Sequence, residues 1–169
     1  MRSLLLLPVL TFALHGQESP LSARVQAAPR LRVDALRQLQ GELALETNPA
    51  KGYYEGLLDY EIVAQTRDQD PEGAEALLNR SLAAIRTRKD PESLALQAAL
   101  LGLKIGFEPS AAMSLGPRVE SLFDEARDAA PGSPRVLLLQ GINVLHTPAF
   151  FGGGADAALP ILQAAVKAA

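Results

Sequence analysis

Proline follows a helix-capping side chain at four places along this 169-residue sequence. The four pairs are Asn48–Pro49, Asp70–Pro71, Asp90–Pro91 and Ser133–Pro134. The first side chain of each pair can accept a hydrogen bond from a free backbone N–H at the start of a helix. Proline is tolerated at the first helical position because its missing N–H would have no partner there. The pairs are separated by the length of a helix and a turn, so they predict an all-α fold.

Apolar residues recur at helical spacing, as Leu36, Leu39 and Leu43 illustrate. A weaker start signal, Gly116–Pro117, has glycine in place of a capping side chain. Together these patterns predict helices over residues 31–46, 50–67, 71–88, 91–106, 117–130, 134–146 and 156–168. Most connections between them are short, and a short connection makes neighbouring helices antiparallel, so we expect the helices to pair as hairpins.

The composition favours a folded domain and argues against several functions. Hydrophobic residues make up 48% of the chain, which is enough for a sizeable core. The net charge is −3 without a basic block, which disfavours a nucleic-acid partner. The chain has no cysteine, and this excludes disulfides, thiolate metal sites, cysteine nucleophiles and a lipid-attachment cysteine. We expect no catalytic residues, no metal site and no cofactor.

The N-terminus has the pattern of a secretory signal peptide. Arg2 supplies a positive charge, Leu4 to Leu14 is an apolar run, and Gly16 is a small residue at a cleavage position. An N-terminal core helix is the alternative interpretation. No later segment reaches the roughly 18 apolar residues of a membrane span. We therefore expect a signal peptide over 1–16, no membrane span, and a mature protein that is periplasmic or secreted.

The segment 17–30 is polar and rich in proline, serine and alanine, which predicts a flexible lead-in. The helical repeat domain then covers 31–169. Its last helix carries Leu159, Leu162 and Val166, and no polar helix follows to cover them. We expect this edge either to continue in a longer chain or to pack against another chain, including a second copy.

Two segments in the second half of the chain share one pattern of small and large residues. The first is Ala98-x-x-Leu101-Gly102-x-x-Ile105 followed by Val119-x-x-x-Phe123-x-x-Ala126, and the second is Leu137-x-x-Gln140-Gly141-x-x-Val144 followed by Ala158-x-x-x-Leu162-x-x-Ala165. A glycine in the first helix of a hairpin lets the second helix approach closely, and the alanines allow the same approach from the other side. Gly102 and Gly141 therefore mark two expected helix contacts.

This pattern resembles the tetratricopeptide repeat. The resemblance covers about 91–169, and 48–90 more loosely, and it implies antiparallel hairpins stacked as a right-handed superhelix. The two glycines are 39 residues apart, about five more than the usual repeat, so HEAT-like or generic hairpins are the alternative. The combination Pro-Arg-Val…Gly-Ile-Asn…Thr-Pro-x-Phe-Phe-Gly-Gly-Gly…Ala-Leu-Pro also looks like exported bacterial tetratricopeptide-like proteins, which implies an envelope location.

The stretch from His146 to Asp156 joins the last two expected helices and contains three glycines. A phosphate-binding loop would need a following lysine, which is missing, and Asp156 would repel a phosphate. The glycines are therefore expected to form a tight turn. Phe150 and Phe151 either fold back onto the helix pair or present an apolar surface to a partner. His146 is expected to be structural or to suit the end of its helix, and it is also a candidate partner contact.

Tyr53, Tyr54 and Tyr60 lie on the helix expected over 50–67. In tetratricopeptide folds the first helix of each hairpin lines the concave surface. The resemblance therefore implies that the three tyrosines are candidate contacts to an extended peptide.

Glu55 and Asp59 lie one turn apart on the same helix. Paired carboxylates could do acid–base work or bind a cation, or they could form a solvated acidic face. We expect a non-catalytic module that binds an unknown protein or peptide. The alternative is an accessory protein that handles a small ligand or solute in a pocket closed by the 146–156 loop. An enzyme would require the carboxylates to converge with His146.

Overall fold

The computed structural model describes residues 20–28, 31–47 and 50–169, and these segments form helices without a strand. The α-helices are α1 (Pro20–Gln26), α2 (Val33–Ala44), α3 (Lys51–Thr66), α4 (Pro71–Ile85), α5 (Pro91–Phe107), α6 (Ala112–Ala129), α7 (Pro134–His146) and α8 (Ala155–Ala168). Short 3₁₀ helices, Pro109–Ala111 and Ala149–Phe151, precede α6 and α8. The all-α prediction is confirmed for the described residues. The expected signal peptide over 1–16 and the Asn48–Pro49 start lie outside them.

Three of the expected helix starts have their caps. Asp70, Asp90 and Ser133 each accept a hydrogen bond from the backbone N–H three residues later, and proline begins α4, α5 and α7. The start expected at Gly116–Pro117 is wrong, because α6 begins at Ala112 and contains Pro117. The 3₁₀ helix before α6 already gives the chain helical angles, so the helix forms ahead of the proline at the cost of one hydrogen bond.

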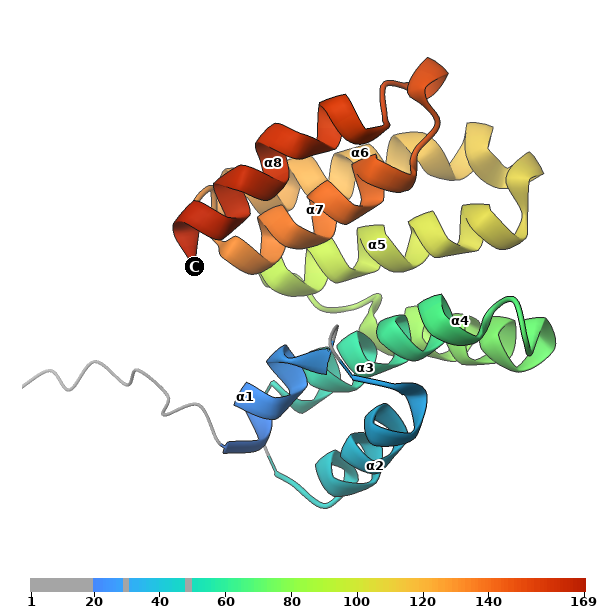
Figure 1. The fold of residues 1–169 in the computed structure, drawn as a ribbon, viewed down its shortest axis with the longest axis vertical. Helices are drawn as coiled ribbons and strands as arrows, with labels where there is room; N and C mark the ends of the chain where they lie inside the picture. The colour runs from blue at the N-terminus through green and yellow to red at the C-terminus, as the bar shows by residue number, and fades with distance from the viewer. Residues whose placement is uncertain (1–19, 29–30, 48–49) are drawn as a thin grey trace, which may run out of the picture.

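The helices pair as hairpins of α3 with α4, α5 with α6, and α7 with α8 (Figure 1). The first helices of successive hairpins also touch, since α5 packs on α3 and α7 packs on α5. Arg135 on α7 reinforces the second contact, because its Nη1 donates to both carboxylate oxygens of Glu92 on α5, at 3.1 and 2.9 Å. α2 packs on α3 and so extends the stack at the other end.

α3 and α5 are enclosed by their neighbours. Every residue from Gly56 to Val63 is buried on α3, and every residue from Ser93 to Leu100 is buried on α5. α3 packs against α2, α4 and α5, whereas α5 packs against α3, α4, α6 and α7. A helix with neighbours on most of its sides keeps no broad polar face. The core of the molecule therefore lies around these two helices.

Part of the lead-in expected over 17–30 forms a packed helix where the structure describes it. α1 packs on α2 and α3, and Leu21, Val25 and Ala28 are buried in the main core. These three residues recur at helical spacing, but the polar residues between them hid the pattern. The helical domain therefore begins with α1, before residue 31.

The two repeat glycines behave differently. A Cβ on Gly141 would lie 2.5 Å from the Leu162 side chain of α8, so this glycine allows the expected approach within its hairpin. A Cβ on Gly102 would instead collide with Asn143 on α7. Gly102 therefore makes room for the next hairpin and not for α6, which corrects the expected contact.

Candidate functional site

The loop between α7 and α8 is closed by its own hydrogen bonds. The backbone N–H and the hydroxyl of Thr147 donate to the Asn143 carbonyl at 3.0 and 2.9 Å. The Gly154 N–H donates to the Val144 carbonyl at 2.9 Å and joins the two ends of the loop. The 3₁₀ helix Ala149–Phe151 thus lies in a loop whose two ends are fixed by hydrogen bonds.

The three glycines make this turn possible. Gly152 and Gly154 have positive φ angles of 82° and 96°, which other residues rarely adopt. A Cβ on Gly153 would collide with the Thr147 carbonyl. Asp156 lies in the first turn of α8, so a carboxylate already occupies the positive end of that helix. The structural role expected for the glycines is confirmed.

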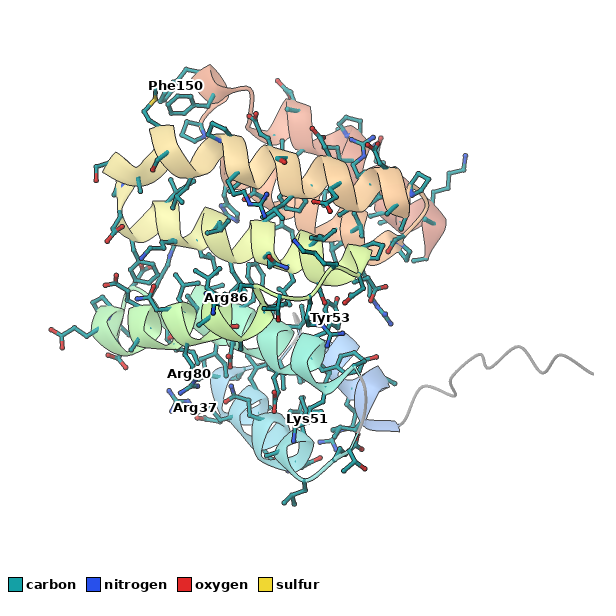
Figure 2. The ribbon with its side chains drawn as sticks, turned by 180° about the vertical axis from the view of Figure 1, so that it is seen from behind. Arg37, Lys51, Tyr53, Arg80, Arg86 and Phe150 are labelled. Carbon is teal, nitrogen blue, oxygen red and sulfur yellow. The ribbon has the colours of Figure 1, made fainter. Side chains whose placement is uncertain are left out.

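Phe150 and Phe151 project from the loop into solvent. Phe150 is 80% exposed and Phe151 is 52% exposed, and their ring centroids lie 4.2 Å apart. Figure 2 places Phe150 at one end of the molecule. Of the two alternatives drawn from the sequence, the exposed apolar surface is the one found.

His146 is the last residue of α7 and is exposed. Together with Phe150 and Phe151 it gives the loop three exposed ring side chains, and we call these three residues the aromatic loop. A neutral imidazole nitrogen can ligate a metal ion, and aromatic rings stack on flat ligands. The aromatic loop therefore carries one group able to coordinate a metal ion and two exposed apolar rings.

Tyr53, Tyr54 and Tyr60 are buried in the core, which corrects the expectation that they face a peptide. The rings of Tyr53 and Tyr54 meet edge to face, with centroids 5.5 Å apart. Burial raises the pKa of Tyr53 and raises that of Tyr60 to about 12. The physical reason is the position of α3, whose neighbours α2, α4 and α5 cover these side chains.

A polar cleft of about 480 Å³ lies between α2, α3 and α4. It is lined by Gln40, Gly41, Gly52, Glu55, Gly56, Asp59, Arg80, Ser81 and Ala84. Of these residues, the sequence pattern indicates Glu55 and Asp59 as candidates for binding or acid–base chemistry. The sequence offered a signal for Gly41, Gly52 and Gly56, because glycine inside a helix is less stable than alanine and therefore needs a reason.

Asp59 is the deepest charged group of the polar cleft, and it is only 8% exposed. Gln40 Nε2 donates to its Oδ1 at 2.5 Å. Burial raises the pKa of the Asp59 carboxyl, and the charge of Arg80, the hydrogen bond from Gln40 and the nearby Ser81 hydroxyl oppose the rise without cancelling it. The solvated acidic face expected for Glu55 and Asp59 is therefore wrong for Asp59, whereas Glu55 is half-buried.

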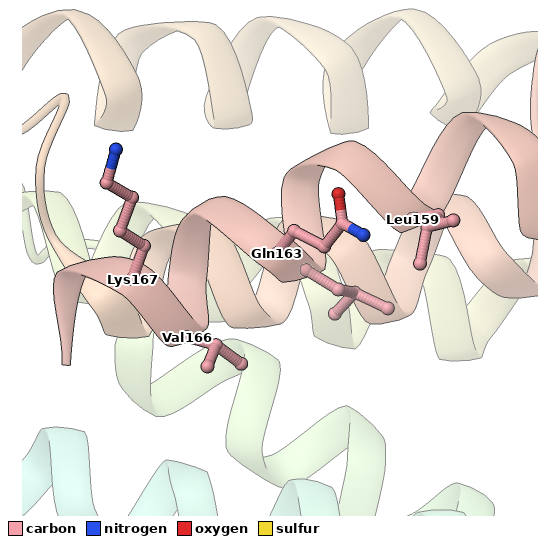
Figure 3. Close-up of a pocket in the computed structure, with 5 residues that line it drawn as sticks. Leu159, Gln163, Val166 and Lys167 are labelled. Atoms are coloured by element: carbon pink, nitrogen blue, oxygen red, sulfur yellow. The ribbon is translucent and has the colours of Figure 1, made fainter.

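A second hollow, of about 380 Å³, lies open on the outer side of α8 (Figure 3). It is lined by Leu159, Leu162, Gln163, Val166 and Lys167. Val166 is 79% exposed. The expected uncovered edge is thus present at Leu159 and Val166, whereas Leu162 is half-buried and lies against Gly141 of α7. We call Leu159, Leu162 and Val166 the α8 stripe.

Glu55 and Asp59 do not converge with His146, as the enzyme alternative drawn from the sequence would require. Glu55 and Asp59 face the polar cleft with residues from α2 and α4, whereas His146 lies at the end of α7. The described part of the chain holds no group of three or more His, Asp or Glu side chains that could bind a metal ion.

Within the described residues, no helix is long and apolar enough to cross a membrane.

No protein-family model and no curated protein matches this sequence. Among solved structures, the chain is similar to the HusA haemophore from Porphyromonas gingivalis, with a TM-score of 0.60 and 22% sequence identity. The similarity covers 90% of this chain and 82% of the haemophore. At this level of identity, the two chains share a fold over most of their length.

Proposed function

We propose that this protein is an exported, non-catalytic carrier that binds a flat, largely apolar ligand of the haem class on its aromatic loop. In this proposal the signal peptide over 1–16 directs the chain to the periplasm or out of the cell. The hairpins stack as a right-handed, tetratricopeptide-like superhelix. The observation that carries the proposal is the exposed pair Phe150 and Phe151, which follows the exposed His146 by four and five residues in the chain.

The exposed rings provide the affinity. Burying a phenylalanine side chain that water now covers gains about 1.5–3 kcal/mol. The loop is closed by the hydrogen bonds of Thr147 and Gly154, so binding orders little that is not already ordered. A ligand that stacks on such a platform keeps most of the gain.

His146 provides the selectivity for a metalloporphyrin. Histidine is a common axial ligand of haem iron, and this imidazole is exposed at the end of α7, where the loop with the two rings begins. The haemophore with the similar fold is the reason to choose haem among flat ligands. The residues that would hold the haem are argued from this chain alone.

Titration of the purified protein with haemin, followed by the Soret absorption, tests the proposal. We expect saturable binding that weakens by roughly tenfold or more in Phe150→Ala/Phe151→Ala. His146→Ala is expected to move the Soret band of bound haemin but to leave binding of metal-free protoporphyrin unchanged, because only the iron needs an axial ligand. Leu45→Ala is the matched control, since Leu45 is exposed but lies outside the loop.

Two results would contradict the proposal. One is a wild-type protein that does not bind haemin saturably. The other is a Phe150→Ala/Phe151→Ala variant that binds haemin as tightly as the Leu45→Ala control.

A second candidate function is contact with a protein partner through the α8 stripe. The supporting observation is the open apolar hollow beside Leu159 and Val166, with Lys167 at its edge. A pull-down from envelope extract tests it with Val166→Glu and Phe150→Ala/Phe151→Ala as separate baits. Loss of a partner with Val166→Glu alone favours the stripe, and recovery of the same partners by every bait removes this candidate.

A further inference from the structure

The polar cleft is separate from the aromatic loop and from the α8 stripe, since it lies between α2, α3 and α4. Its negative and positive charges come from different helices. Glu55 and Asp59 come from α3, whereas Arg80 comes from α4. We propose that this cleft binds a small zwitterion whose ammonium and carboxylate groups lie close together, the class to which free α-amino acids belong.

The polar cleft contains buried polar groups whose hydrogen bonding a ligand would complete. Ser81 is 2% exposed, and its hydroxyl makes no hydrogen bond of acceptable geometry within the described residues, although it lies close enough to Asp59 to lower the pKa of that carboxyl. Buried polar groups in folded proteins nearly always have partners. Among the described residues, the Gln40 amide is the donor that lies in hydrogen-bond geometry with Asp59. An ammonium group has three N–H donors and would satisfy both Asp59 and Ser81.

The rim of the cleft offers a positive charge to the other end of the ligand. The Arg80 side chain is exposed, and no ion pair joins it to a carboxylate within the described ranges. Figure 2 shows Arg80 and Arg37 at the same margin of the molecule. A guanidinium group binds a carboxylate through two parallel hydrogen bonds, so Arg80 suits the carboxylate of a zwitterion.

Two of the three glycines that line the cleft leave space beside them. A Cβ on Gly41 would meet no atom within 4 Å, and a Cβ on Gly52 would meet only Arg88, at 3.7 Å. The space at these glycines is therefore not used by neighbouring helices. The volume of about 480 Å³ lies within the range of small-molecule sites.

The charges of the cleft disfavour other ligand classes. A phosphate would meet the carboxylates of Glu55 and Asp59. A divalent cation would find two carboxylates, and Arg80 would repel it. An apolar ligand would leave Asp59 and Ser81 without partners, which is costly for buried groups.

Isothermal titration calorimetry with a panel of free L-α-amino acids tests the inference. We expect at least one to bind saturably at millimolar concentration or below. Its N-acetyl derivative lacks the ammonium group and its amide derivative lacks the carboxylate, and each is expected to bind roughly tenfold more weakly or worse. Mg²⁺ alone and inorganic phosphate alone are expected not to bind.

Three variants locate the site. Asp59→Asn is expected to abolish binding of the free amino acid. Arg80→Gln is expected to weaken binding of the free amino acid by roughly tenfold but to leave the amide derivative unaffected. Arg86→Gln is the matched control, because Arg86 is an exposed arginine at the end of α4 outside the cleft.

Gly41→Leu keeps the test decisive if Asp59→Asn fails to fold. Leucine favours helix over glycine, so this variant is expected to be at least as stable as wild type while its side chain fills the cleft and blocks binding. The inference is overturned if no free amino acid binds, if the N-acetyl derivative binds equally well, or if Gly41→Leu binds like wild type. Phe150→Ala/Phe151→Ala should bind the amino acid normally, so failure here is distinct from failure of the haem proposal.

Discussion

Gly141 of α7 lies directly against Leu162 of α8, and a Cβ at position 141 would come within 2.5 Å of the leucine Cδ2 and 2.7 Å of its Cγ. α7 and α8 can therefore approach this closely because residue 141 has no side chain. Gly41 on α2 offers the opposite case, since a Cβ there would meet no atom within 4 Å.

These two glycines give a matched pair of stability predictions. Alanine is favoured over glycine in a helix by about 1 kcal/mol, so Gly41→Ala should raise the free energy of unfolding by up to that amount. Gly141→Ala should lower it by about 1 kcal/mol or more, because crowding in a packed contact outweighs the helical gain. Urea unfolding of the two variants measures both changes. A stabilising Gly141→Ala would contradict the packing described for α7 and α8.

Glu61 on α3 predicts a pH dependence of stability. Burial raises the pKa of its carboxyl from 4.5 to about 7. The unfolded chain therefore releases this proton at lower pH than the folded chain, and stability falls as the pH rises from about 4.5 to 7. Asp59 acts in the same direction, because burial also raises its pKa.

The Glu61→Gln variant isolates the contribution of Glu61. Its free energy of unfolding should decrease less than that of wild type between pH 5 and pH 8, by roughly 1–3 kcal/mol. Urea unfolding at the two pH values measures the difference. Equal decreases in the two proteins would mean that Glu61 does not titrate in this range.

Removing the N-terminal cap of α5 is expected to destabilise the protein. Asp90 Oδ1 accepts from the Ser93 N–H at 3.0 Å, and its other oxygen lies 3.2 Å from Arg88 Nη2. Asp90→Ala should lower the free energy of unfolding by about 0.5–2 kcal/mol, whereas Asp90→Ser should keep most of the cap. Thermal unfolding compares the two, and equal losses would show that the capping bond is not what matters.

The packing of α1 leads us to expect that the N-terminal part of the chain contributes to the free energy of unfolding. Val25 is fully buried there, whereas Ala23 is exposed. Val25→Ala should lower the free energy of unfolding by about 1–3 kcal/mol, and Ala23→Ser should leave it nearly unchanged. If both variants unfold like wild type in urea, α1 does not stabilise the domain.

The helices were predictable from the sequence because their starts are local. Asp70, Asp90 and Ser133 act on backbone N–H groups three residues away, so no tertiary information is needed to recognise them. The start of α6 was missed because the 3₁₀ helix before it has no strong signal of its own. α1 was missed because a short helix acquires its stability from packing and not from its own sequence.

The candidate sites were less predictable, because exposure depends on neighbours far along the chain. Tyr53 and Phe150 are both aromatic residues next to another aromatic residue. Tyr53 is buried on α3, a helix that packs against α2, α4 and α5, whereas Phe150 faces solvent. The partners of Asp59 in the polar cleft come from α2 and α4, which only the fold brings together. Gly152 and Gly154, in contrast, were interpretable because the turn requires their backbone angles.

The proposal that the aromatic loop holds a haem-class ligand is tested most directly by mapping where the ligand binds. The measurement is a ¹H–¹⁵N NMR titration of the labelled protein with zinc protoporphyrin, which is diamagnetic and can accept an axial imidazole. The account predicts the largest chemical-shift changes at the amides of His146 to Gly154, with no comparable change at the polar cleft. Saturable binding with the largest changes elsewhere, or no changes at saturating porphyrin, would contradict it.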